Sequence, residues 1–298
     1  MIDRIVVAVD ETEAAAAALG WTVDLVAHEH ALGHDVHTTL LTVHEPREFI
    51  GIEGYGLVKS AHAVAEAQEL LGDLLQVEPA AANFERVIGG GEVSRAILDE
   101  ARHQHADLIV VGTRHLGTVR QAMVGSVSQF VAAQRECPVA VVPAEATRSQ
   151  DRVLVGYDGS AGARAAIRWA LENCEGPVHV VHVVEAEVDL IESHEALAAL
   201  VPALGDEAIG RVTAESVVGD PVEVLTDPTW AAPQVVVGAR SDSDQRDAIW
   251  GSVTTRVLAV TECPVVVVPP EPWNWGPHAR NCVAPPGGAR TARRSSRP

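Results

Sequence analysis

Short apolar runs alternate along this chain with longer segments in which apolar and polar residues are mixed. The run Ile5–Val9 opens the pattern, and the alanine-rich segment 13–28 follows it. A short apolar run bounded by turn residues predicts a buried strand, whereas apolar residues three or four positions apart predict a helix. The first half then continues with predicted strands at 37–45, 84–88, 108–111 and 139–142 and helices at 57–76, 94–104 and from Gly125.

The second half repeats this order. Residues 110–143 and 238–269 both have a strand, a glycine-containing loop, a helix start and a Cys-Pro strand. In each stretch 13 positions separate the first glycine from the one at the helix start, and 12 more lead to the cysteine. The chain is therefore a tandem repeat. The paired landmarks are Gly112 and Gly238, Gly125 and Gly251, and Cys137 and Cys263, and further strands of the second copy are predicted at 153–157, 178–186 and 213–218, with a helical region at 195–208.

Each copy alternates strand and helix through five strands, which predicts a parallel sheet with helices on both faces. We expect one domain at 1–145 and a second at 150–270. The second copy is shorter in its middle, because 81 positions lead from Asp10 to Gly91 but 61 from Asp158 to Gly219. The tail 271–298 has five Arg, one Glu and many Pro and Gly, which predicts disorder.

Ligands of such sheets bind beyond the carboxyl ends of the strands, where the strand order reverses. A helix that starts there presents unpaired N–H groups and the positive end of its dipole to an anion. The positions at or just past the strand ends are Asp10, Val43, Gly112 and Gly125 in the first copy and Asp158, Val183, Gly238 and Gly251 in the second.

The strand-end Asp, the G-x2-G-x9-G-[ST] type of loop and the Cys-Pro strand together resemble the universal stress protein family, in both halves. The resemblance implies two tandem Rossmann-like (adenine nucleotide alpha hydrolase-like) domains that hold ATP or AMP, with or without Mg²⁺, at the carboxyl edge. It implies strand-end aspartates near adenine, valine backbone contacts, and a loop and helix start around ribose and phosphates. The residues it implicates are Ala8, Asp10, Val43, Val111, Gly112, Arg114, His115, Gly125, Ser126 and Val127 in the first copy and Asp158, Val183, Gly238, Arg240, Gly251 and Ser252 in the second.

Both copies depart from the loop pattern at its second glycine, which is His115 in one and Ser241 in the other. A Cβ there should obstruct the close approach of backbone to phosphate. Anion binding at a helix start needs only N–H groups, so we still expect adenine nucleotide in at least one half. The first should bind better, because residues 113–124 include two Arg and no acid, whereas 239–250 include three Asp.

Simpler interpretations of the same residues remain. Asp10 and Asp158 could cap the helices that follow them, and the two Gly-Ser pairs could be helix starts only. No nucleophile–base–acid set is visible, so no catalytic residue is named. The histidines lack the spaced pair and carboxylate of a helical zinc site, so we expect no metal. Three classes of function are therefore considered: a nucleotide-binding stress or regulatory protein, a nucleotide-free pseudo-dimeric interaction scaffold, and a weak ATPase.

The net charge of −19 is spread evenly, with 21 acidic and 9 basic residues in 1–145 and 19 and 8 in 146–270. Nucleic acid is therefore not an expected partner. A single lysine, Lys59, in so acidic a chain is typical of a high-salt cytoplasm, where ions screen charges over ~3 Å, and points to a halophilic archaeon. A GC-rich genome that replaces Lys by Arg is the alternative.

The remaining composition concerns location and assembly. No apolar run reaches the ~18 residues of a membrane span, and a strand predicted at the first residues leaves no expected signal peptide. Four distant cysteines without C-x-x-C spacing indicate neither zinc nor disulfides, so we expect a cytoplasmic protein. The apolar edge strands 138–142 and 264–268 should pair antiparallel within one chain, as in family dimers. The sequence does not decide whether the chain forms a higher oligomer or which protein partner it has.

Overall fold

The computed structural model describes residues 2–44, 55–113, 126–146, 152–174, 176–230, 232–239 and 252–270, with the main chain alone at 55–61, 207 and 252. The tail 271–298 lies outside these ranges. The first half contains β1 (Arg4–Val9), α1 (Glu13–Ala31), β2 (His37–His44), α2 (Tyr55–Val77), the 3₁₀ turn η1 (Pro79–Asn83), β3 (Glu85–Gly90), α3 (Val93–Gln104), β4 (Leu108–Thr113), α4 (Ser126–Ala133) and β5 (Val139–Pro143).

The second half has the same order with shorter helices in its middle. It contains β6 (Val153–Tyr157), α5 (Ala161–Asn173), β7 (Val178–Val184), η2 (Glu187–Asp189), α6 (Leu190–Ala203), η3 (Asp206–Ala208), β8 (Val212–Val218), α7 (Pro221–Leu225), η4 (Pro228–Trp230), β9 (Gln234–Gly238), α8 (Ser252–Val260) and β10 (Val265–Val268).

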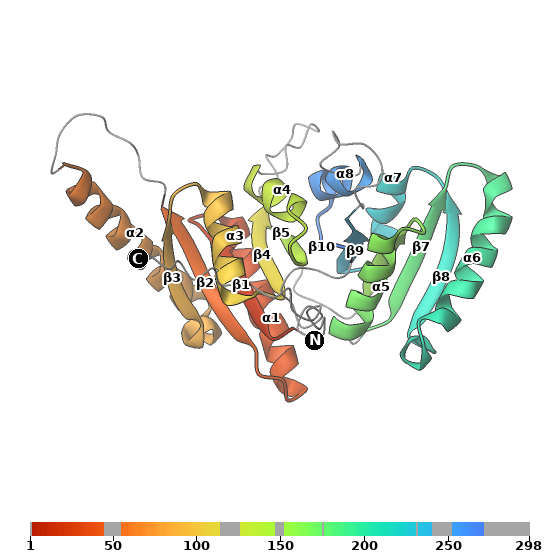
Figure 1. The fold of residues 1–298 in the computed structure, drawn as a ribbon, viewed down its shortest axis with the longest axis horizontal. Helices are drawn as coiled ribbons and strands as arrows, with labels where there is room; N and C mark the ends of the chain where they lie inside the picture. Colours follow the sequence, from red (N-terminus) through yellow and green to blue (C-terminus); the bar gives the residue numbers. More distant parts are fainter. Residues whose placement is uncertain are drawn as a thin grey trace, which may run out of the picture.

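The strands of both halves form one ten-stranded sheet in the order β3-β2-β1-β4-β5-β10-β9-β6-β7-β8 (Figure 1). Each half is parallel, and the halves join where β5 and β10 pair antiparallel, with Val139 opposite Val267 and Val141 opposite Val265. This confirms the predicted pairing of the two Cys-Pro strands within one chain. The apolar edge of each half is therefore covered by the other half.

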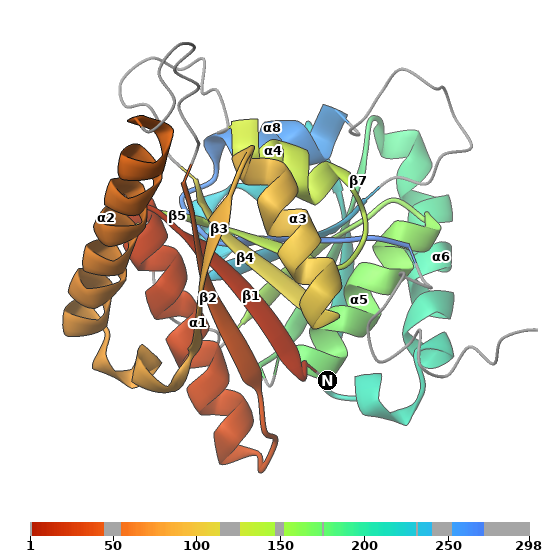
Figure 2. The ribbon, with the colours of Figure 1, turned by 60° about the vertical axis from the view of Figure 1, so that its left-hand side comes forward.

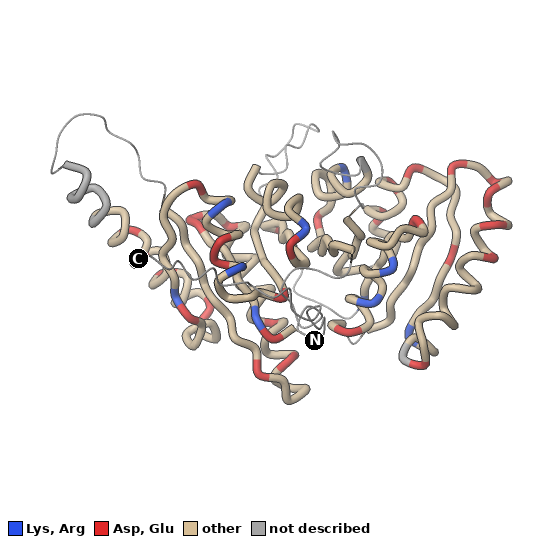
Figure 3. Tube along the Cα trace, viewed as in Figure 1, with Lys and Arg blue, Asp and Glu red and all other residues tan. Residues whose placement is uncertain are grey.

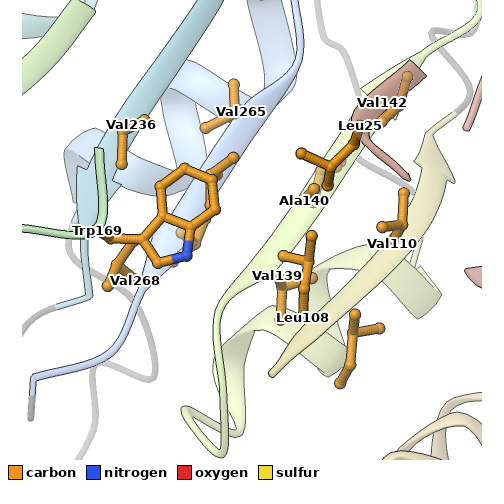
Figure 4. Packing of buried hydrophobic residues seen from close by; sticks show 14 of the residues in the cluster. Leu25, Leu108, Val110, Val139, Ala140, Val142, Trp169, Val236, Val265 and Val268 are labelled. Atoms are coloured by element: carbon orange, nitrogen blue, oxygen red, sulfur yellow. The ribbon is translucent and has the colours of Figure 1, made fainter. Parts of the chain in front are cut away.

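Helices cover both faces of the sheet, as predicted. Figure 2 shows α1 and α2 on one side of the first half and α3 and α4 on the other. The central strands between them are mostly apolar, and the buried hydrophobic residues of both halves form one continuous core. Figure 4 shows this core where the halves meet, with Val139 and Val142 on one side and Val265, Val268 and Trp169 on the other. The two repeats are thus packed as one body.

One helix of the second half differs from its predicted bounds, and another is much shorter than its counterpart in the first half. The helix predicted at 195–208 runs instead from Leu190 to Ala203, because Gly205 adopts a left-handed φ of 89° that ends the helical path. The helix after β8 has five residues against 12 in α3. Pro228 limits it, because proline has no N–H and disfavours helical backbone at the residue before it. The sheet of the second half is consequently less covered by helix on the face where α7 lies.

Candidate functional site

The described strand-end residues among the predicted site residues of the first half lie together where the strand order reverses. β1 pairs with β2 on one side and β4 on the other, which places Ala8 opposite both Leu41 and Val111. The next residues along these strands bring Asp10, Val43 and Gly112 to one carboxyl edge. The chain leaves β1 toward β2 and β3 and later returns on the other side to β4, so this edge is the topological switch point.

Asp10 organises the turn between β1 and α1. Its Oδ1 accepts a hydrogen bond from the Thr12 N–H at 3.0 Å and another from the Thr12 hydroxyl. The Thr12 side chain in turn accepts from the Ala15 N–H and is the N-cap of α1. The interpretation of Asp10 as the helix cap is therefore wrong, because the cap lies two residues later and Asp10 holds it in place.

The second half has the same turn. Asp158 accepts from the Ser160 N–H at 3.0 Å, and the Ser160 side chain caps α5 by accepting from the Ala163 N–H. The capping interpretation is wrong here too. Asp158 is exposed, whereas Asp10 is half-buried. The two aspartates share their local geometry and differ in how far solvent reaches them.

Gly112 and Gly238 are required by packing between strand and helix. A Cβ on Gly112 would lie 2.6 Å from the carbonyl carbon of Ala14 in the first turn of α1. A Cβ on Gly238 would lie 2.2 Å from the carbonyl carbon of Gly162 in α5. These glycines therefore let the helix approach the strand end closely, which gives them a purpose independent of any ligand.

Thr113 is a further candidate site residue, which the sequence did not single out. It ends β4 directly after Gly112 and is only 3% exposed, yet its hydroxyl has no hydrogen-bond partner among the described residues. A buried hydroxyl without a partner costs stability, so its position at the strand ends makes Thr113 a candidate to meet a polar ligand. The signal in the sequence was a hydroxyl residue closing an otherwise apolar run. Ala239 follows the equivalent glycine in the second half.

The two predicted helix starts are present. α4 begins at Ser126, which is exposed, and Val127 after it is half-buried; α8 begins at Ser252. The N–H groups of these first turns have no partner within the helix. The predicted contacts Arg114, His115, Gly125, Arg240 and Gly251, and the side chain of Ser252, lie outside the described residues.

The carboxyl edge of the second half holds a polar cluster that was also missed. His182 on β7 lies between β6 and β8, and its Nδ1 is 2.6 Å from the Ser193 hydroxyl of α6. That hydroxyl is 2.5 Å from the hydroxyl of Ser216. The ring of Tyr157 meets the imidazole edge-on, with centroids 5.8 Å apart. The predicted contact Val183 is the next residue on β7.

Burial lowers the pKa of His182 below the ordinary value of a histidine, although the nearby charge of Asp158 works in the opposite direction. The first half has apolar or small residues in this register, since Val9 faces Thr42 and Thr42 faces Ile88. The signal for the cluster was the pair of histidines in the apolar strand VHVVHVV.

The described cysteines are free thiols. Burial raises the pKa of Cys137, and it raises the pKa of Cys174 to about 12. Cys137 is thus the small buried side chain that was predicted, while Cys263 is only half-buried. Within the described ranges, no three His, Cys, Asp or Glu side chains converge as metal ligands. No helix in these ranges is both long enough and apolar enough to cross a membrane.

Comparison with known proteins matches both halves. The sequence profile of the universal stress protein family matches residues 1–143 and 150–269. A universal stress protein of Mycolicibacterium smegmatis is 26% identical over 301 residues, which covers 89% of this chain and 97% of that protein. The crystal structure of a universal stress protein from Archaeoglobus fulgidus has a TM-score of 0.68 at 21% identity, covering 89% of this chain and 98% of its own.

A further solved structure is a universal stress protein in complex with cAMP, which is 22% identical, with a TM-score of 0.32, over 40% of this chain and 95% of its own. The Mycolicibacterium and Archaeoglobus proteins match along nearly their whole length. The tandem arrangement is therefore shared with them.

Proposed function

This chain belongs to the universal stress protein family over both repeats, and we propose that it is a stress-response or regulatory protein whose first repeat binds an adenine nucleotide, ATP or AMP. The site is the carboxyl edge of β1, β2 and β4. The observation that carries the proposal is the buried Thr113 hydroxyl, which has no hydrogen-bond partner among the described residues and lies at the switch point beside Gly112. An unsatisfied polar group in this position fits a polar ligand better than a purely structural edge.

The residues at this edge fit the parts of a nucleotide. Asp10 would accept hydrogen bonds from the base or ribose, and Val43 would contact the base through its backbone. Thr113 would donate its hydroxyl to ribose or phosphate oxygen. The start of α4 at Ser126 would face the phosphates with its free N–H groups, and Mg²⁺ would bind through those phosphates.

The second repeat is proposed as the weaker site. Ala239 offers a methyl group where Thr113 offers a hydroxyl, and the loop after it contains Asp242, Asp244 and Asp247. Like charges at ~5 Å cost on the order of 1 kcal/mol even in water, so several carboxylates disfavour a triphosphate. Mg²⁺ between phosphate and aspartate would reduce this difference.

The setting of the protein is part of the same proposal. We propose that the chain consists of two domains, 1–145 and 150–270, and a separate tail. We also propose that it is a cytoplasmic protein adapted to high salt, as in a halophilic archaeon. Nucleotide in the first repeat would change the affinity for a protein partner. The nucleotide-free scaffold and the weak ATPase are the other outcomes of the tests below.

Calorimetry with ATP and AMP, with and without Mg²⁺, tests the site. Asp10→Ala should abolish binding, whereas the matched variant Asp158→Ala should leave the stronger site intact. Thr113→Val keeps the shape of the side chain and removes only the hydroxyl, so we expect an affinity loss of about fivefold to tenfold. Melting curves of each variant separate loss of binding from loss of fold, since Asp10 also holds the Thr12 cap.

The proposal is contradicted if Asp158→Ala abolishes binding while Asp10→Ala leaves it unchanged. Mass analysis of any small molecule released from native protein gives an independent result. Absence of nucleotide there, together with no heat of binding, would favour the scaffold. Turnover of ATP that survives rigorous purification would favour the ATPase.

A further inference from the structure

A hollow of about 330 Å³ lies at the opposite edge of the sheet, at the amino ends of β6, β7 and β8. Arg152 and Pro177 directly precede β6 and β7, and His179 and Thr213 are the second residues of β7 and β8. Trp230 of η4 completes the wall. The hollow is therefore separate from the carboxyl edge, where the proposed nucleotide site lies.

The hollow exists because the second repeat lacks a long helix here. In the first repeat α3 packs over β1, β2 and β3 and buries Leu98 and Ala101 in its last turns. In the second, α7 ends at Leu225, and η4 follows. The repeats still align in one detail, since Arg4 and Arg152 each donate Nη1 to a main-chain carbonyl at 3.3 Å, those of Gln104 and Trp230 respectively.

The polar groups that line the hollow are already paired, with one exception. The two ring nitrogens of His179 lie 2.6 Å from the Thr213 hydroxyl and 2.7 Å from a carboxylate oxygen of Glu215. The Trp230 Nε1–H donates to the Val224 carbonyl at 2.6 Å. Thr229 is likewise bound through its side chain to Asp227.

Arg152 is the exception among these lining residues. Its Nη1 makes the bond to the Trp230 carbonyl, and within the part of the chain that the structure describes its Nε and Nη2 donors have no partner, so an exposed guanidinium lies at the rim. A guanidinium with spare donors binds a carboxylate through two parallel hydrogen bonds. The rim of the hollow is thus suited to an anion.

The rest of the lining is suited to a flat apolar group. The rings of Trp230 and His179 lie with centroids 5.0 Å apart, tilted by 41°, and Pro177 adds aliphatic surface. The volume is at the lower end of the range for small-molecule sites and holds one or two fused rings. We propose that this hollow binds a small aromatic carboxylate, with its ring against Trp230 and His179 and its carboxylate on Arg152.

The full chain, titrated with 1-naphthoate by calorimetry and ligand-observed NMR, tests this proposal. We expect saturable binding of 1-naphthoate and on the order of tenfold weaker binding of the neutral 1-naphthamide. Arg152→Gln should reduce the affinity for naphthoate to that for the amide. Trp230→Leu should weaken both compounds, because both place a ring on this side chain.

Arg4→Gln is the matched control, because it removes the same Nη1 bond to a carbonyl in the first repeat, away from the hollow. It should leave naphthoate binding unchanged, and melting curves should show similar small losses of stability in both arginine variants. The proposal is overturned if naphthoate does not saturate, if Arg152→Gln binds like the wild type, or if both arginine variants lose affinity equally. Displacement of naphthoate by saturating ATP also overturns it, since the compound would then occupy the carboxyl edge.

Discussion

Over the strands β1, β2 and β3 of the first repeat, α3 extends for 12 residues, whereas α7 extends for five over the second repeat. The amino edge of the second repeat is consequently hollow. At the carboxyl edge the first repeat has the Thr113 hydroxyl, which no other described residue pairs, and the second has Ala239 and the polar cluster around His182. The repeats therefore differ at both edges of the sheet.

The same comparison shows what the repeats keep. Both have an aspartate two residues before a hydroxyl cap, and both have a glycine where the first helix touches the strand end. Both also pair their last strand with that of the other repeat. Residues that the packing of helix against strand requires are thus the same type in both repeats. Residues at the amino and carboxyl edges of the sheet differ between the repeats. This pattern is expected if one fold carries two different ligand edges.

The largest effect should come from Gly112→Ala and Gly238→Ala, which test the shared packing. Each new Cβ would lie 2.6 Å or closer to helix backbone, and neither backbone can move without disturbing the core. We expect each variant to lose about 3 kcal/mol or more of unfolding free energy, measured in denaturant. Because one sheet joins the repeats, both should shift the same cooperative transition.

Gly72→Ala is the control for this pair. Gly72 lies inside α2, and a Cβ there has nothing within 4 Å. Alanine is favoured over glycine in a helix by about 1 kcal/mol, so this variant should be neutral or more stable. Equal destabilisation by all three substitutions would contradict the packing argument.

Salt should act on both repeats alike. Acidic residues are spread over both halves in Figure 3, and the net charge of the chain is −19. Raising KCl from low millimolar to molar screens their repulsion, so the melting temperature should rise by on the order of 5 °C or more. A flat or falling melting temperature would remove the high-salt interpretation, and two separate transitions would show that the halves respond differently.

The pair Glu29 and His34 belongs to the first repeat and should stabilise the fold through it. The Glu29 side chain is 3% exposed and its Oε2 lies 2.7 Å from His34 Nδ1, closing the end of α1. His34→Ala leaves this carboxylate buried without that partner, so we expect a loss of about 1–3 kcal/mol. His30→Ala is the control, because His30 is about half exposed and lies 4.0 Å from an exposed aspartate. Similar losses in both variants would contradict the role of the buried pair.

The ten strands and the antiparallel pairing of β5 with β10 were predicted from the sequence alone. Runs such as 139–142 are wholly apolar, and the repeat provides a second copy of each run that supports the same prediction. The sequence also predicted the edge at which Asp10 and Gly112 meet, because parallel strands align their carboxyl ends. It did not reveal that Thr12 is the cap, since Asp and Thr are both good caps.

Thr113 and His182 were missed for a different reason. Whether a polar residue in an apolar strand is paired depends on the neighbouring strands and helices, which local pattern does not record. No bounds were predicted for the helix after β8, so its length of five residues is a finding of the structure.

The smallest effect should be a pH dependence that belongs to the second repeat. Burial lowers the pKa of His182 in the folded chain below 6.5, so the unfolded chain takes up a proton first as the pH falls. Stability contributed by the neutral ring is complete above about pH 6.5 and is lost as the pH falls below it, by at most about 1.4 kcal/mol per pH unit and less for a half-exposed ring. Thr42, which occupies this register in the first repeat, does not titrate.

Unfolding free energies of the wild type and of His182→Gln between pH 7.5 and 5 measure the difference, since glutamine retains a polar side chain toward Ser193 and cannot take up the proton. We expect the wild type to lose more stability than the variant across this range. Parallel pH profiles would contradict the assignment of the effect to His182.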